Sequence, residues 1–216
     1  MINYLFDSSV AIEWYAPKST FRTQSEFYKS CALRAKIAFQ KEEGKAILFI
    51  PSFCIAEVRN IFGKWYLRHK NIFNSKNPKA HYETCFNKFI AHVHDRKFFY
   101  SYDLNRYHNL NTTEVIEVEH TTDTEFDASG LTPGTNNTII EAEFKKKDSH
   151  DSISKHHLTS FDILIIAMGM ELKRMKGEEI YLVTNDKRMA LISSKKSEFP
   201  KPLYWSDLNV PDLPTA

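Results

Sequence analysis

Cysteine is rare in this sequence, and long apolar runs are missing. Its 216 residues include three cysteines, Cys31, Cys54 and Cys85, which lie far apart and form no C-x-x-C pair. This odd, scattered set predicts neither a disulfide framework nor a cysteine metal site, and it favours a reducing, cytoplasmic setting. No stretch approaches the about 18 uncharged apolar residues of a membrane span, and the N-terminus lacks the charged-then-apolar pattern of a signal peptide. We therefore expect no membrane partner.

Glycine is scarce, and neither sign of charge dominates. The chain has 6 glycines but 16 phenylalanines and 10 tyrosines, so we expect an aromatic-rich core. Hydrophobic residues make up 42% and charged residues 26%, which are ordinary globular values, and the length fits one domain over residues 1–216. The 29 basic and 27 acidic residues give a net charge of +2, which is not by itself the signature of a nucleic-acid-binding protein.

Short apolar strands alternate with helical patterns along the chain. The predicted strands cover residues 2–6, 46–50, 98–102, 179–186 and 203–205, and the predicted helices cover about 20–43, 53–69, 78–95, 159–177 and 187–193. The strands are mostly apolar and do not alternate regularly with polar residues, as expected when both faces of a sheet are covered. The sequence therefore predicts an α/β fold, a three-layer α/β/α sandwich around a mostly parallel sheet.

The region from about 104 to 157 differs in character from the rest. It contains the turn-rich segment "TTDTEFDASGLTPGTNNT" and the charged segment "FKKKDSHDS". Residues 114–119, "EVIEVE", alternate between polar and apolar, which predicts an extra strand or hairpin. We interpret 104–157 as an insertion in the domain, made of this hairpin and of loops.

Four acidic residues fall where the predicted strands end or the following helices begin. Asp7 follows the first strand and Asp186 follows the strand "YLVT". Glu57 lies one turn into the helix after the second strand, and Asp162 lies in the first turn of a strongly apolar helix. Ligands of parallel α/β sheets bind outside the carboxyl ends of the strands, so we expect these four acids to lie at one functional edge.

Each acid also has a structural alternative. Asp7 can cap the helix that starts near Val10, Glu57 can face solvent at the rim of its helix, Asp162 can form a capping box with Thr159, and Asp186 can be a turn residue. Four converging carboxylates, however, repel one another unless a cation lies among them. Oxygen-only ligands select a hard ion, Mg²⁺ or Mn²⁺, and the hydroxyls of Ser9 and Thr184 can orient such ligands.

The same residues carry a family resemblance. "FDSSVAIEW" resembles the opening D-x-S-v motif of PIN-domain proteins, particularly the VapC-type toxin ribonucleases. "PSFCIAEVRNIF" resembles their strand-Pro-helix segment with its glutamate, "LTSFDILIIAMGMEL" their aspartate-bearing helix, and "YLVTND" their last acidic strand end. The four motifs occur in the family's order and cover both ends of the chain, whereas nothing in 104–157 matches the family.

The resemblance implies a metal-dependent endoribonuclease. Asp7, Glu57, Asp162 and Asp186 would then be the catalytic, metal-binding residues for Mg²⁺ or Mn²⁺, with Ser9 and Thr184 as supporting hydroxyls. The implied partners are an RNA substrate, a small antitoxin protein if the chain is the toxin of a toxin–antitoxin pair, and a second copy in a homodimer. Lys187 and Arg188 directly follow Asp186 and are the first candidates for phosphate contacts, with a solvated helix face as their alternative.

Two other functions are compatible with parts of the pattern. Phosphatases of the haloacid-dehalogenase type also begin with an Asp after the first strand, but they need a second Asp two residues on, where this chain has Ser9. A catalytically silent PIN-like module that binds RNA or protein is the remaining alternative, and the complete set of four acids favours the nuclease over it.

Overall fold

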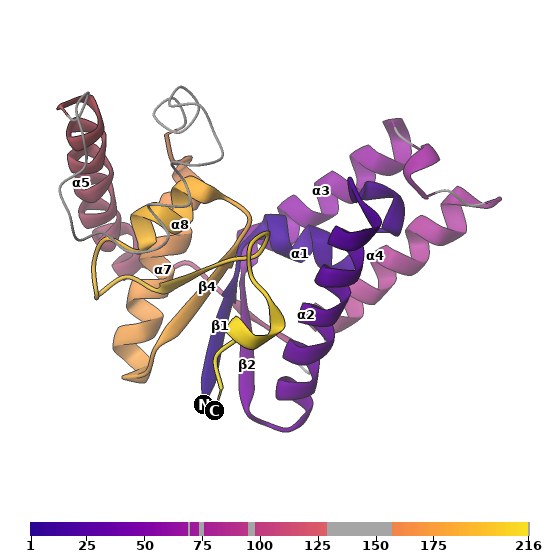
Figure 1. Ribbon diagram of the computed structural model, residues 1–216, viewed down its shortest axis with the longest axis horizontal. Coiled ribbons are helices and arrows are strands. Elements are labelled where there is room, and N and C mark those ends of the chain that lie inside the picture. The colour runs from indigo at the N-terminus through magenta and orange to yellow at the C-terminus, as the bar shows by residue number, and fades with distance from the viewer. Residues whose placement is uncertain (69, 74–75, 95–97, 129–156, 216) are drawn as a thin grey trace.

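Five parallel strands form the centre of the molecule. The computed structural model describes residues 1–68, 70–73, 76–94, 98–128 and 157–215. The strands are β1 (Ile2–Phe6), β2 (Ala46–Pro51), β3 (Phe99–Tyr102), β4 (Ile180–Thr184) and β5 (Lys201–Tyr204). They follow the order β3-β2-β1-β4-β5, and every neighbouring pair is parallel (Figure 1). The chain crosses from one side of β1 to the other after β3, which places the switch point of the sheet beside β1.

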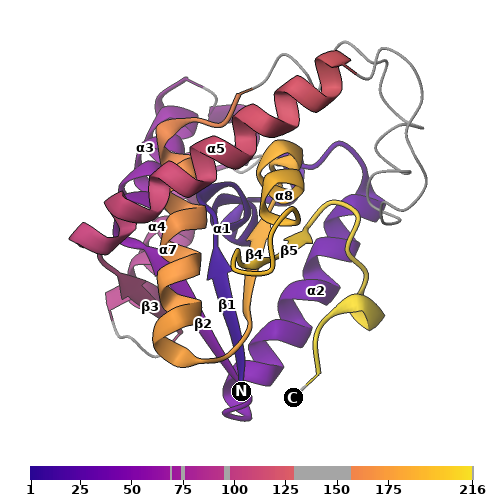
Figure 2. The same cartoon turned by 90° about the vertical axis from the view of Figure 1, so that its left-hand side faces the viewer.

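Helices cover both faces of this sheet. They are α1 (Ser8–Tyr15), α2 (Gln24–Glu42), α3 (Ser52–Arg68), α4 (Pro78–His94), α5 (Arg106–Ala128), α7 (Ser160–Lys176) and α8 (Lys187–Ser193), with 3-10 turns at Lys18–Thr20, Lys70–Phe73 and Val210–Asp212. Helices α1 to α4 lie on one side, and α5, α7 and α8 lie on the other (Figures 1 and 2). The predicted three-layer α/β/α sandwich is therefore confirmed. No helix in the described ranges is long and apolar enough to span a bilayer.

Buried aromatic rings dominate the core. All five residues of β1 are buried, which explains why that strand is apolar apart from Asn3. The Phe6 ring meets Trp14 and Phe99 edge to face, at centroid distances of 5.5 and 5.3 Å. Offset and edge-to-face pairs of this kind add stability beyond the area that they bury. The expectation of an aromatic-rich core is confirmed.

Local capping signals set the helix boundaries. A capping box between Thr23 and Glu26 starts α2 at Gln24, four residues later than the sequence predicted, because the turn at Lys18–Thr20 precedes it. Gly177 closes α7 with a left-handed φ of 63°, a conformation that a side chain would disfavour.

The predicted hairpin at 114–119 is wrong, because these residues belong to α5. Val115 and Val118 are buried, whereas Ile116 is 38% exposed, so burial follows the three-residue spacing of a helix. A short stretch of alternating apolar and polar residues fits both the two-residue period of a strand and the 3.6-residue period of a helix. Here the packing of α5 against α7 favours the helix. The rest of the proposed insertion, residues 129–156, lies outside the described residues.

Candidate metal and active site

Asp7 lies at the carboxyl end of β1 and is only 5% exposed. It precedes α1, but its side chain makes no capping hydrogen bond to that helix. Three hydroxyls instead donate to its carboxylate: Ser8 Oγ to Oδ1 at 3.2 Å, Ser9 Oγ to Oδ2 at 2.5 Å, and Thr184 Oγ1 to Oδ2 at 3.1 Å. The capping alternative for Asp7 is therefore not realised, and its carboxylate is held in a ring of hydroxyls.

This carboxylate is electrostatically uncompensated among the described residues. Burial raises the pKa of Asp7, and the hydrogen bonds from Ser9, Thr184 and Ser8 only partly oppose that rise. No lysine, arginine or histidine in the described ranges forms an ion pair with it. A buried carboxylate without a cationic partner carries a large desolvation penalty, so a cation would bind favourably here.

Asp162 and Asp186 both cap the helices that they begin. Thr159 N donates to Asp162 Oδ2 at 2.8 Å, and Asp162 N donates to Thr159 Oγ1 at 3.3 Å, which is the capping box that the sequence offered as an alternative. Met189 N donates to Asp186 Oδ1 at 2.8 Å, so Asp186 is the N-cap of α8. The caps engage Oδ2 of Asp162 and Oδ1 of Asp186. Within the described part of the chain, the second oxygen of each carboxylate accepts no hydrogen bond.

The charges of the acids act on one another across the sheet edge. Burial is the main cause of the raised pKa of Asp162, and the charges of Asp186 and Asp7 raise it further. The Cys54 thiol, fully buried in α3, has a pKa raised by burial and then by Asp7, Glu57 and Asp162. Asp7 and Asp186 are linked through Thr184, whereas Glu57 and Asp162 are connected to Asp7 only through these electrostatic effects. Glu57 is the exposed member, at the rim.

The donor set fits a hydrated hard cation better than a closed cage. All four side chains offer carboxylate oxygens, the ligand type that Mg²⁺ and Mn²⁺ prefer. Among the described residues, no group of three or more His, Cys, Asp or Glu side chains is arranged tightly enough to enclose a metal ion. Mg²⁺ commonly keeps several waters and binds through one or two carboxylates, so the absence of a preformed cage is compatible with that ion.

The two predicted supporting hydroxyls do contact Asp7, and they connect it to the other strand end. Thr184 Oγ1 donates to Asp7 and accepts the backbone N–H of Asp186 at 2.9 Å. Ser9 Oγ donates to Asp7 and accepts the N–H of Asn185 at 3.2 Å. These hydroxyls therefore fix the orientation of Asp7 relative to the end of β4, as outer-sphere groups do around metal ligands.

A second carboxylate network beside Asp7 was not predicted from the sequence. Glu13 accepts hydrogen bonds from Asn185 Nδ2 at 2.8 Å and from Trp205 Nε1 at 2.7 Å. It thereby ties α1 to the ends of β4 and β5. The sequence shows Glu13 on the same helix as Ser9, but it does not show that the end of β5 lies beside that helix.

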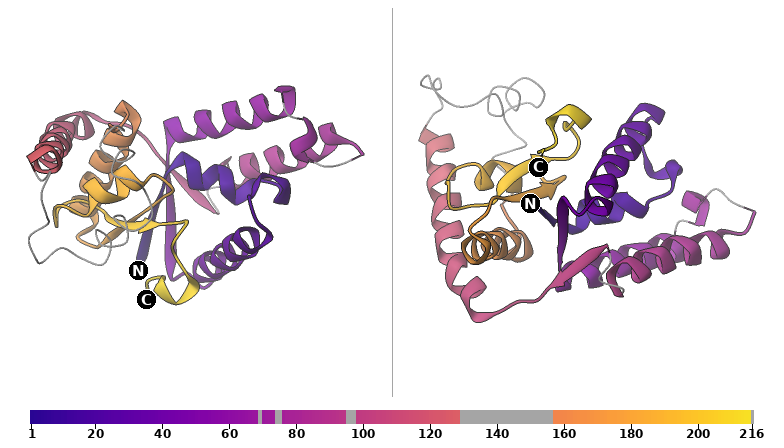
Figure 3. Two further views of the ribbon diagram at one scale, coloured as in Figure 1. Left: turned by 45° about the horizontal axis from the view of Figure 1, so that its top comes forward. Right: turned by 90° about the horizontal axis from the view of Figure 1, so that it is seen from below.

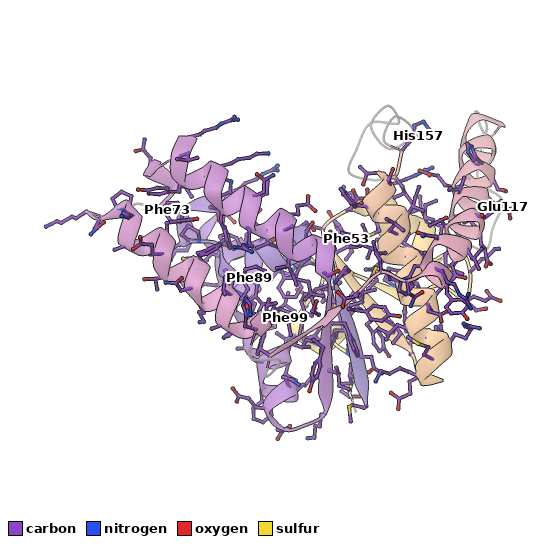
Figure 4. The ribbon with its side chains drawn as sticks, turned by 180° about the vertical axis from the view of Figure 1, so that it is seen from behind. Phe53, Phe73, Phe89, Phe99, Glu117 and His157 are labelled. Carbon is purple, nitrogen blue, oxygen red and sulfur yellow. The ribbon has the colours of Figure 1, made fainter. Side chains whose placement is uncertain are left out.

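An aromatic pair joins the two helices that carry Glu57 and Asp162. The rings of Phe53 and Phe161 are stacked, with centroids 5.2 Å apart and planes 21° apart. Phe53 lies one helical turn before Glu57, at the start of α3 near the sheet edge (Figure 4), and Phe161 directly precedes Asp162. Phe161 is 54% exposed. One face of an aromatic stack is therefore accessible next to the acids.

Arg188 is not on the surface, which corrects its interpretation as an RNA contact. It is 4% exposed, and its Nε lies 3.8 Å from Oε1 of the buried Glu119 of α5. Glu119 Oε1 also accepts the N–H of Leu158 at 2.6 Å, just before α7 begins. Arg188 therefore joins α8 to α5 and to the start of α7. Lys187 is half-buried and lines the cleft described next.

A cleft of about 1100 Å³ is lined by neighbours of Asp7 and Asp186, although none of the four predicted acids lines it. Ser9 and Glu13 of α1, Asn185 after β4 and Lys187 of α8 form the end nearest Asp7. The rest of the cleft runs between α2 and the residues that follow β5, and Lys29 Nζ of α2 donates to the carbonyl of Ser206 at 2.8 Å across it. The candidate site therefore has space for a substrate on the α1 and α2 side.

No protein-family model matches this sequence, and comparisons with curated proteins and with solved structures return no significant match.

Proposed function

We propose that this protein is a metal-dependent endoribonuclease that hydrolyses single-stranded RNA at the carboxyl edge of its sheet. The observation that carries the proposal is the buried Asp7 carboxylate, which has no cationic partner among the described residues and lies within the electrostatic reach of other acids. Its position at the strand ends beside the switch point is where parallel α/β sheets bind ligands. The resemblance of four ordered motifs to PIN-domain proteins independently supports the same activity.

In this proposal Asp7, Asp162, Asp186 and Glu57 hold a divalent cation, and Ser9 and Thr184 keep Asp7 oriented toward it. A bound Mg²⁺ or Mn²⁺ ion supplies polarisation of the scissile phosphate and activation of a water. The residues of the chain position the ion and exclude bulk water on the core side. Lys187, at the cleft beside Asp186, offsets the negative charge of a bound phosphate.

A cysteine nucleophile is disfavoured even though a thiol lies near the acids. Burial and three neighbouring carboxylates raise the pKa of Cys54, so the reactive thiolate is suppressed. Its side chain is also fully buried in α3 and cannot meet a substrate. Water activated at the acidic cluster is therefore the nucleophile that the site supports best.

A single strand suits the site better than a duplex. The accessible face of Phe161 can stack on a base only when that base is splayed out of a helix, as bases of single-stranded RNA are. The toxin role, with its small antitoxin and homodimer, rests on the family resemblance alone and remains a proposal.

The second candidate is a PIN-like module that binds RNA or protein without cleaving it. The capping roles of Asp162 and Asp186 favour it, because caps give both residues a structural reason to be acidic. It leaves unexplained the burial of Asp7, which makes no cap and no ion pair with the described cations.

A cleavage assay separates the two candidates. Purified protein with Mn²⁺ should cut a mixed pool of single-stranded RNA, and EDTA or Asp7→Asn should abolish cutting while the circular dichroism spectrum stays unchanged. Asp103→Asn is the matched control, because Asp103 also follows a strand, β3, but is exposed. Retained cleavage in Asp7→Asn, or an uncut pool with wild-type protein and Mn²⁺, would contradict the nuclease proposal.

A further inference from the structure

A second cleft of about 1170 Å³ lies between α2 and α4, which are on the same side of the sheet (Figures 1 and 3). Four phenylalanines from separate segments contribute to its lining: Phe21 and Phe27 near the start of α2, Phe73 before α4, and Phe98 before β3. Phe73 is buried and the other three are half-buried. Partly exposed aromatic rings therefore line the cleft at Phe21, Phe27 and Phe98.

The lining of this cleft is strongly basic for a chain of net charge +2. Lys18, Arg22, Arg34 and Lys88 line it, and Glu42 is the one acidic residue among the described lining residues. The first cleft, in contrast, has three basic and three acidic lining residues: Arg22, Lys29, Lys187, Glu13, Glu26 and Asp207. Positive charge is thus concentrated in the second cleft, where a polyanion would be attracted.

Several of these cations are placed over or beside the aromatic rings. The guanidinium of Arg34 lies 5.8 Å from the centroid of Phe27, and Lys18 Nζ lies 5.9 Å from it. Arg34 is held there by hydrogen bonds to the carbonyls of Trp14 and Ser30. Single-stranded nucleic acids bind where positive charges follow the phosphates and rings stack on the bases. Both elements are present in one groove.

The two clefts adjoin each other. Ala16, Phe21 and Arg22 line both of them, so the segment between α1 and α2 lies between the two clefts. The first cleft reaches Ser9 and Asn185 beside Asp7, and the second extends beside α2 as far as Glu42. Helix α2 has 19 residues and is about 28 Å long at 1.5 Å per residue. A strand that leaves the first cleft would cross the segment between α1 and α2 and then run beside α2 in the second cleft.

We propose that the α2/α4 cleft binds single-stranded RNA on one side of the cleavage site, as an extension of the active-site cleft. This inference rests on the proposed nuclease function and adds a substrate requirement to it. Strands long enough to reach the second cleft bind more tightly than strands that fill only the first. A duplex keeps its bases stacked inside the helix, cannot offer them to the aromatic rings, and binds weakly.

Thiol footprinting tests this directly, because Cys31 and Cys85 line the second cleft whereas Cys54 is fully buried elsewhere. Wild-type protein in EDTA is alkylated with iodoacetamide at mildly alkaline pH, with and without RNA. A single strand of about 16 nucleotides should slow modification of Cys31 and Cys85, and one of about 4 nucleotides should protect them less. Cys54 is the internal control, because its reactivity reports only unfolding. Equal reactivity with and without the long strand, or protection by an acidic peptide and not by RNA, would overturn the inference.

A pair of lysines on α4 provides a second readout. Lys88 lines the cleft, whereas Lys79 is nine residues away on the opposite face of the helix and pairs with Glu83 at 3.8 Å. Lys88→Ala should weaken binding of the long strand several-fold and reduce the slope of log affinity against log salt by about 0.7. Lys79→Ala should change neither. If the two substitutions weaken RNA binding equally, the affinity depends on the net charge of the protein and not on this cleft, which would contradict the inference.

The outcomes for the cleft and for the catalytic proposal are distinguishable. If RNA is cleaved but does not protect Cys31 and Cys85 from alkylation, the proposed role of the second cleft is wrong and the nuclease proposal stands. Protection without cleavage in Mn²⁺ supports the binding cleft and contradicts the nuclease, leaving an RNA-binding module.

Discussion

Asp7 is the residue at which structure and chemistry conflict most. Burial raises its pKa above the value of about 3.9 in an unfolded chain. The folded state therefore binds a proton more tightly than the unfolded state, and the free energy of unfolding falls as pH rises through the interval between the two pKa values. Above that interval the destabilisation is fully present. The burial of Asp7 therefore makes the metal-free protein less stable as the pH rises above the ordinary pKa of an aspartate.

The hydroxyl of Thr184 should control metal affinity through Asp7. Thr184→Val keeps the shape of this fully buried side chain but removes the hydrogen bond to Asp7 Oδ2. We expect a 10–100-fold loss of Mn²⁺ affinity, roughly the effect of removing an outer-sphere partner, measured as the Mn²⁺ concentration for half-maximal cleavage. Thr122→Val, which removes a buried hydroxyl that donates within α5, is the control. If Thr184→Val needs the same Mn²⁺ concentration for half-maximal cleavage as wild type, Thr184 does not contribute to metal binding.

At the scale of elements, α7 and α8 position two of the acids because each helix begins with one of them. The buried Glu119 of α5 holds the backbone before α7 and lies beside Arg188 of α8. The relative placement of Asp162 and Asp186 therefore depends on an ion pair that lies behind the site.

Two adjacent basic residues should then behave differently. Arg188→Ala should lower the free energy of unfolding by about 3–5 kcal/mol, the usual effect of removing one member of a buried pair. Lys187→Ala should leave stability within about 0.5 kcal/mol and weaken RNA binding. Urea denaturation and RNA affinity measured on both variants check this. A stable Arg188→Ala protein with a selective loss of RNA binding would restore Arg188 as a substrate contact.

The packing of α7 against the segment before β5 depends on a glycine. A Cβ atom on Gly169 would lie 2.6 Å from Cγ of Pro200, so Gly169→Ala must displace that segment and should destabilise the protein by about 1–3 kcal/mol. Gly63→Ala in α3 meets nothing within 4 Å and should stabilise it by about 0.5–1 kcal/mol. Thermal unfolding of the two variants is the measurement. If both substitutions raise the melting temperature, Pro200 moves away from the new Cβ atom at little cost and the prediction is wrong.

At the scale of the whole molecule, local patterns predicted the sheet well. Apolar runs bounded by turn residues gave all five strands, and the Thr159 box and Gly177 gave both ends of α7. The strands and the ends of α7 were predicted correctly because they depend on short-range signals. The convergence of Asp7, Asp162 and Asp186 on one metal ion, which the same parallel connectivity predicted, stays a prediction.

Features that depend on packing between distant segments were missed. Residues 114–119 were predicted as a strand or hairpin because their alternation fits a strand as well as a helix. Only the packing of α7 against them, which the local sequence does not show, decides for the helix. The bonds of Glu13 to Trp205 and the burial of Arg188 by Glu119 both join segments that are far apart in the chain. No single segment of the sequence carries that information.

The central claim, that the acidic edge is built for a divalent cation, is tested most directly by thermal unfolding at neutral pH in EDTA and in excess Mn²⁺. In EDTA, Asp7→Asn should melt at a higher temperature than wild type, because it replaces a buried carboxyl group, whose ionised form burial disfavours, with a neutral amide. Mn²⁺ at about 100 times its Kd should stabilise wild type by about 2.7 kcal/mol and reverse that order, while Asp7→Asn gains little. A wild-type protein that Mn²⁺ does not stabilise, or equal stabilisation of both proteins, would contradict the account.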